Sequence, residues 1–175
     1  MTDEIYKMKK FEDECIKQLI QTKYHRTPHE INLYKLALTH KINPGVAHNN
    51  GLAYIGDAIL KFVIRDYYCR ELNTNDTGIL TPILSKMESN ITFSGIADEL
   101  EIPDHMCMSR SQINQPEPIS PDMRANAFEA IIGAIYVDYR NEGLEKAIES
   151  SRIVLTPYLK KELGRYRINV SDKEQ

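Results

Sequence analysis

Cysteine is scarce in this sequence and irregularly placed. The chain has three cysteines, Cys15, Cys69 and Cys107, and none of them forms a CxxC motif or a Cys/His spacing typical of a metal site. This pattern indicates neither a disulfide framework nor a zinc site. We therefore expect an intracellular, cytoplasmic protein.

The chain also lacks long uninterrupted hydrophobic runs. Charged residues are spread through residues 1–19, MTDEIYKMKKFEDECIKQL, where a signal peptide would carry an apolar stretch. No later segment approaches the ~20 apolar residues of a membrane-spanning helix. We expect neither secretion nor association with a membrane.

A net positive charge is missing as well. The formal net charge is -3, so the protein as a whole has no positive field that would attract nucleic acid. Any contact with RNA must then be local. The composition, with 42% hydrophobic and 27% charged residues over 175 positions, is typical of a single folded domain.

Apolar residues recur at helical spacing along most of the chain, and no segment alternates convincingly as a strand would. We predict an all-α fold with helices at 5–20, 28–40, 52–72, 82–100 and 123–139, and one or two more from 144. The helix at 52–72 is expected to be central, and 109–122 to be a long loop. We assign 1–30 to an N-terminal helix packing on the domain, 31–160 to the domain and 161–175 to a polar tail.

Two carboxylates interrupt apolar helical segments, Asp57 in LAYIGDAIL and Glu129 in FEAIIGAIY. A buried carboxylate needs a cation, hydrogen bonds or a raised pKa. Lys61 is four residues after Asp57 and Arg124 five before Glu129, so structural ion pairs are one interpretation. If the two helices pack side by side, the acids instead converge on a divalent cation such as Mg²⁺, with Mn²⁺ as a possible substitute.

Several segments match a known pattern in order and spacing. NNGLAYIGDAIL at 49–60 resembles the signature helix of ribonuclease III, NERLEFLGDAVL in its usual wording. LTH at 38–40, the segment 80–90 and AFEAIIGAIY at 127–136 resemble further motifs of that family. The resemblance implies a dimeric, all-helical bundle that hydrolyses double-stranded RNA with carboxylates holding Mg²⁺. It places the essential aspartate at Asp57 and the essential glutamate at Glu129.

The match departs from the family at four positions of the acidic site. Ala53, Asn126 and Asn50 stand where the family has Glu, Asp and Glu, and Gly51 stands where it has Arg. Of the four acids expected to face the metal, those at positions 53 and 126 are lost and Asp57 and Glu129 remain, although the amide oxygen of Asn126 can still ligate a metal. We expect weaker metal binding, with one tightly held ion.

Two functions follow from this reduced site. The wording LAYIGDA resembles the Mini-III branch of the family, active nucleases without an RNA-binding domain, and favours a metal-dependent endoribonuclease acting on double-stranded or structured RNA. The lost acids instead favour a catalytically inactive homodimer or heterodimer that binds RNA or protein. Glu129→Gln separates the two, since it should abolish cleavage only in a nuclease.

The resemblance also implies contact residues. Tyr54 occupies the position of an aromatic residue that inserts into the partner subunit, so we assign Tyr54 and Ile55 to a dimer interface, although an aromatic at helical spacing can be ordinary core. Lys86, Arg110 and Arg124 are candidates for contacting RNA. Too few residues follow position 158 for a double-stranded RNA-binding domain, so we expect RNA binding to be modest and salt-sensitive.

Overall fold

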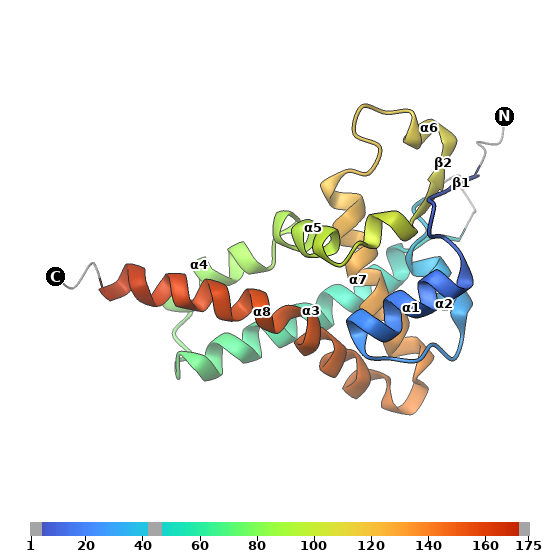
Figure 1. Cartoon of the computed structure of the whole chain (residues 1–175). Helices are drawn as coiled ribbons and strands as arrows, with labels where there is room; N and C mark the ends of the chain where they lie inside the picture. Colours follow the sequence, from blue (N-terminus) through green and yellow to red (C-terminus); the bar gives the residue numbers. More distant parts are fainter. Residues whose placement is uncertain (1–4, 42–46, 172–175) are drawn as a thin grey trace.

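The computed structural model describes residues 5–41 and 47–171, and most of these residues are helical (Figure 1). The predicted all-α class is confirmed. In chain order the elements are β1 (Ile5–Lys7), α1 (Asp13–Tyr24), α2 (Ile31–Ala37), α3 (Asn50–Glu71), α4 (Thr77–Met87), α5 (Asn90–Glu99), η1 (Ile102–His105), β2 (Cys107–Ser109), α6 (Arg110–Ile113), α7 (Pro121–Asp138), η2 (Arg140–Glu142) and α8 (Gly143–Ser171).

The helix at the centre of the fold is α7, not the predicted 52–72 segment that forms α3. Helix α7 is buried on nearly all sides, since Ala127, Phe128 and Ile131 have no exposed surface, and it packs against α2, α3, α5 and α8 (Figure 1). A helix that is apolar all round belongs in a core. Helix α3 is more amphipathic and leaves Tyr54 and Phe62 exposed.

Tertiary pairing shortens the first predicted helix. Residues 5–7 form β1, which pairs antiparallel with β2 so that Ile5 lies opposite Ser109. The helix then begins only at Asp13. The expectation of no strand was therefore wrong for this short ribbon, whose three-residue strands are too short to show alternation.

The boundaries of two other predicted helices also differ from the prediction. The segment 82–100 forms two helices because the Ser89 hydroxyl accepts a hydrogen bond from the Thr92 N–H at 3.2 Å and caps a new helix, α5. Helix α2 begins at Ile31, after Glu30, rather than at Pro28. Within the predicted loop 109–122, α6 forms a single short turn of helix.

The last helix, α8, is one continuous element that extends to Ser171, into the segment expected to be a polar tail. Leu163 is buried in the core, which ties this part of α8 to the domain. Of all the helices in the described part of the chain, none has both the length and the apolar character needed to cross a bilayer.

Two glycines allow α3 and α7 to touch along their backbones. A Cβ atom added to Gly56 would lie 1.8 Å from the backbone oxygen of Glu129, and one added to Gly133 would lie 2.1 Å from that of Leu52. Any larger residue at either position would push the helices apart. Because Asp57 follows Gly56, this contact sets Asp57 beside Glu129.

Candidate metal-binding site

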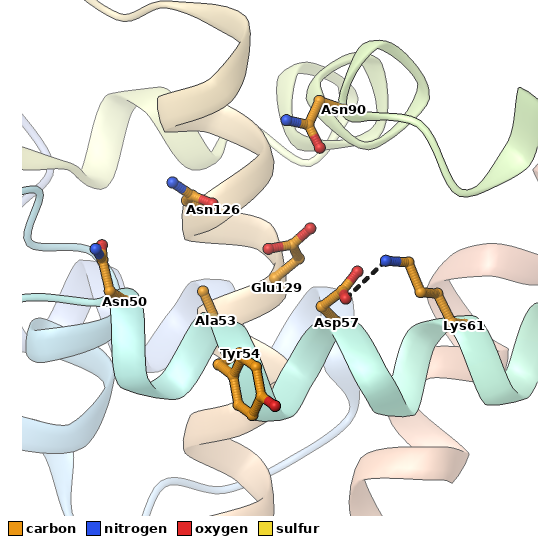
Figure 2. A pocket seen from close by; sticks show the side chains of 8 residues that line it. All are labelled: Asn50, Ala53, Tyr54, Asp57, Lys61, Asn90, Asn126 and Glu129. Carbon is orange, nitrogen blue, oxygen red and sulfur yellow. Dashed lines mark hydrogen bonds and ion pairs between the residues drawn. The ribbon is translucent and has the colours of Figure 1, made fainter. Parts of the chain in front are cut away.

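The contact between α3 and α7 forms one wall of an open pocket of about 360 Å³. Asp57 and Glu129 both face it, so the structure brings together the two acids that stood out in the sequence (Figure 2). The lining residues are Asn50, Ala53, Tyr54, Asp57, Lys61, Asn90, Asn126 and Glu129. The pocket therefore combines two carboxylates, one ammonium group and three amides.

Glu129 is the more buried of the two acids. Only 7% of its surface is exposed, and no described residue forms a hydrogen bond or ion pair with its carboxylate. Burial, together with the nearby negative charge of Asp57, raises the pKa of Glu129 to about 7, while Lys61 opposes the shift. The carboxylate thus has no partner among the described residues. A cation between the two acids would offset both the free-energy cost of burying Glu129 and its repulsion by Asp57.

Asp57 has a partner on its own helix. The Lys61 ammonium donates a hydrogen bond to its carboxylate at 2.8 Å, so the ion pair expected from their spacing is confirmed (Figure 2). The same interpretation for Glu129, an ion pair with Arg124, is wrong. Arg124 instead lies 3.5 Å from Asp98 and donates to the backbone oxygen of Ile119 at 3.0 Å.

The amides form the remaining polar wall of the pocket. Asn126 lies three residues before Glu129 on α7, and Asn50 lies at the start of α3. Asn90, at the first turn of α5, was not identified as a site residue, although it ends the 80–90 motif that pointed to it. Its amide nitrogen donates to Asp122 at 2.9 Å, which links α5 to the start of α7.

The donor set suits one small, hard cation. Carboxylate and amide oxygens are ligands that Mg²⁺ accepts, and Mg²⁺ commonly keeps several of its water molecules. Within 5–41 and 47–171, no three or more His, Cys, Asp or Glu side chains are grouped so as to hold a metal. Asp57 and Glu129 would thus have to hold an ion together with amides and water.

The two residues assigned to a dimer interface lie on α3, and Tyr54 also contributes to the lining of the pocket. The Tyr54 side chain is 83% exposed and points away from Glu129, whereas Ile55 is half-buried (Figure 2). This exposure excludes the interpretation of Tyr54 as ordinary core in the single chain. Tyr54 and Phe62 border a second, largely apolar depression of about 670 Å³.

The three basic residues proposed to contact RNA do not converge on the pocket. Lys86 forms an ion pair with Glu162 of α8, and Arg124 lies near Asp98 and Glu117. Arg110 is exposed at the start of α6. None of these three lines the pocket, whose one cationic side chain among the described residues is Lys61.

The helical fold and the acidic pocket between α3 and α7 are the features by which the class of protein can be identified. The ribonuclease III domain matches residues 50–140, more than half of the chain, and the chain belongs to the ribonuclease III family.

Individual relatives agree with this assignment. Ribonuclease 3 of a Nitratiruptor species is 33% identical over 119 residues, which cover 68% of this chain and 51% of that protein. Ribonuclease 3 of a Sulfurovum species is 32% identical over 66% of this chain and 50% of its own length. The chain thus spans about half the length of these curated relatives.

A solved structure extends the similarity to the fold. The nuclease domain of ribonuclease III from Campylobacter jejuni superposes with a TM-score of 0.71 and 28% identity, covering 81% of this chain and 96% of that domain. That structure was described for its flexibility in a region involved in dimer formation.

Proposed function

We propose that this protein is a metal-dependent endoribonuclease that cleaves double-stranded or structured RNA inside the cell. The observation that carries the proposal is the pairing of Asp57 with an almost buried, unpartnered Glu129 in an open pocket. A fold has no need of such an arrangement, because an unpartnered buried carboxylate costs stability. The motif resemblance also places the family's essential acids at Asp57 and Glu129.

In this proposal Asp57 and Glu129 hold the ion from two helices, and the amide of Asn126 adds a neutral oxygen. Mg²⁺, or Mn²⁺ in its place, would supply Lewis-acid polarisation of the phosphodiester and a lower pKa for the attacking water. Ala53 and Asn126 leave the site with about half of the family's negative charge, so we expect weaker metal binding than in a four-acid site.

The proposal includes assembly into a homodimer through the exposed face of α3. Tyr54 and Phe62 present apolar surface beside the depression described above, and large aromatic residues are typical anchors of interfaces. A heterodimer with a related chain would use the same surface. Lys86, Arg110 and Arg124 stay candidates for RNA contact, and all three would exchange present side-chain interactions for phosphates.

One observation favours a second candidate function, a catalytically inactive dimer that binds RNA or protein. The Lys61 ammonium already neutralises Asp57 at 2.8 Å, which a structural ion pair would also do. In that case the pocket is a remnant, and neither divalent metal nor Glu129 matters for what the protein does.

The deciding experiment incubates the purified chain with a labelled RNA duplex in Mg²⁺ and, separately, in Mn²⁺. Asp57→Asn and Glu129→Gln are tested beside it, after circular dichroism shows that both are folded. If the protein is a nuclease, the wild type gives discrete products. Both variants should then cleave roughly 10³-fold more slowly, as expected when about 4 kcal/mol of transition-state stabilisation is removed. A folded wild-type dimer that cleaves in neither metal supports the inactive module instead.

A further inference from the structure

Lys61 has a position that an ordinary surface lysine does not share. Its side chain, 34% exposed, follows Asp57 by one turn of α3 and lies at the edge of the acidic pocket (Figure 2). It also lines the neighbouring depression bordered by Tyr54 and Phe62. The ammonium group is thus between the acidic site and the exposed face of α3.

A second ion pair on α3 shows what a purely structural pair looks like. Arg70 lies 2.8 Å from Asp66 with the same four-residue spacing, and Arg152 contacts Asp66 from α8 at 3.3 Å. Arg70 is 73% exposed and lines no part of the acidic pocket. Pairs of this kind stabilise a helix only weakly, so helix stability alone gives no reason for a lysine inside the pocket.

The charges of the pocket give Lys61 a role. With both acids ionised, the described lining residues carry two negative charges and one positive charge. A single divalent cation held by Asp57 and Glu129 would be matched by their two charges, and the phosphodiester would bring its own negative charge. An ammonium group has three donors, of which Asp57 engages one through the 2.8 Å contact, so Lys61 can also bind a phosphate oxygen.

We propose that Lys61 binds the RNA phosphate in this pocket. One divalent ion and the Lys61 ammonium group together then neutralise the negative charge of the acids and the phosphodiester, a task that would otherwise need two metal ions. The inference rests on the nuclease function proposed above and assigns a phosphate-binding residue to that site. It also explains how a site with Ala53 and Asn126 works with two acids, because a second metal ion would have too few carboxylates to hold it.

Lys61 has two opposite effects under this proposal, and together they make it testable. Its positive charge competes with the metal for Asp57, so removing it tightens metal binding. The same charge attracts the phosphate, so removing it weakens RNA binding and slows cleavage. A structural ion pair would not give these changes of opposite direction.

The experiment compares the full chain with Lys61→Met, Lys61→Arg and the matched control Arg70→Met, which removes the Arg70–Asp66 pair of the same four-residue spacing. Manganese affinity is measured by electron paramagnetic resonance without RNA, and affinity for an RNA duplex is measured in chelator at several salt concentrations. Cleavage rates are measured at saturating Mn²⁺. Thermal unfolding confirms that each variant is folded.

For Lys61→Met we expect manganese affinity to rise about threefold or more, since a competing charge is removed. Duplex affinity should fall about fivefold, with a salt slope smaller by about one per site. Cleavage should slow by roughly tenfold or more. Lys61→Arg should retain most of the duplex affinity and most of the cleavage rate, and Arg70→Met should match the wild type.

Unchanged duplex affinity and salt slope in Lys61→Met would overturn the inference, as would faster cleavage, which would mean that Lys61 only obstructs the ion. The two proposals fail separately. A wild type that cleaves no duplex refutes the nuclease function, while the duplex affinity of Lys61→Met still decides whether Lys61 binds phosphate. A cleaving wild type with an equally active Lys61→Met refutes only the role of Lys61.

Discussion

Helix α7 carries two acidic residues that have the same overall exposure and different surroundings. Glu129 and Asp138 are each 7% exposed. The Asp138 carboxylate accepts hydrogen bonds from the backbone N–H groups of His29 and Glu30, at 2.9 and 2.8 Å, and from the Tyr34 hydroxyl at 2.9 Å. Glu129 has no such bond within the described chain and faces the pocket.

The difference separates an acid whose partners lie within the fold from one that the fold leaves without a partner. Asp138 fixes the segment before α2 onto the end of α7, and its partners offset the cost of burial. Glu129 keeps its burial cost in the isolated chain, which supports the proposed role of this acid in holding a cation. Burial alone therefore does not distinguish the two acids, whereas the absence of partners among the described residues does.

The largest expected effect is on stability at Asp138. Asp138→Asn should lower the free energy of unfolding by about 4 kcal/mol. The new amide NH₂ group would face one of the N–H or O–H donors whose hydrogen bonds the carboxylate now accepts. Urea unfolding at pH 8 measures the loss. The isosteric control is Glu129→Gln, which removes an unpartnered charge and should leave the protein equally stable or more so. Similar losses in both variants would refute the distinction between the two acids.

A smaller effect is expected from pH. The pKa of Glu129 is raised from 4.5 to about 7, so between these values the folded protein retains a proton that the unfolded chain has released. The contribution of Glu129 to the free energy of unfolding is therefore fully present at low pH. It is lost as the pH rises toward 7, by about 3 kcal/mol in total.

Urea unfolding of the wild type and of Glu129→Gln, at several pH values in chelator, tests this. The difference in unfolding free energy between the two should change by that amount across the interval, and added Mn²⁺ should reduce the change by binding the ionised carboxylate. A difference that is independent of pH would mean that Glu129 is not desolvated in solution.

The smallest effect concerns the amide at position 126 of α7. Asn126→Asp places a third carboxylate at the pocket and should tighten manganese binding about tenfold, through added charge near the ion. Asn114→Asp, which adds the same charge outside the pocket, serves as the control in the same titration. Equal affinities in the two variants would show that position 126 does not face the bound ion.

The sequence predicted more about this protein than its weak overall similarity to individual relatives suggests. The motif at 49–60 and the acid at 129 located both carboxylates of the pocket, and the spacing of Asp57 and Lys61 predicted their ion pair. These succeeded because helix periodicity decides which residues share a face. The long helices α3 and α7 were accordingly found within about two residues of their ends.

The failures depend on contacts between distant segments. The strand at 5–7 exists because it pairs with residues 107–109, which local pattern cannot reveal. Arg124 satisfies the spacing for a pair with Glu129, yet Asp98 on α5 and Glu117 in the preceding loop are nearer to it. Asn90 reaches the pocket from a third helix, so only the packing of α5 on α7 could show its place there.

The sequence by itself determined the helical class, the family and the identity of the two acids, because these depend on periodicity and on which residues occupy fixed motif positions. The tertiary structure alone decided that Glu129 has no protein partner whereas Asp138 has three, and that Lys61 stands inside the acidic pocket. The physical reason is that burial, hydrogen bonding and charge at a site are set by neighbours from other helices. Here the close approach at Gly56 and Gly133 sets how near those neighbours come.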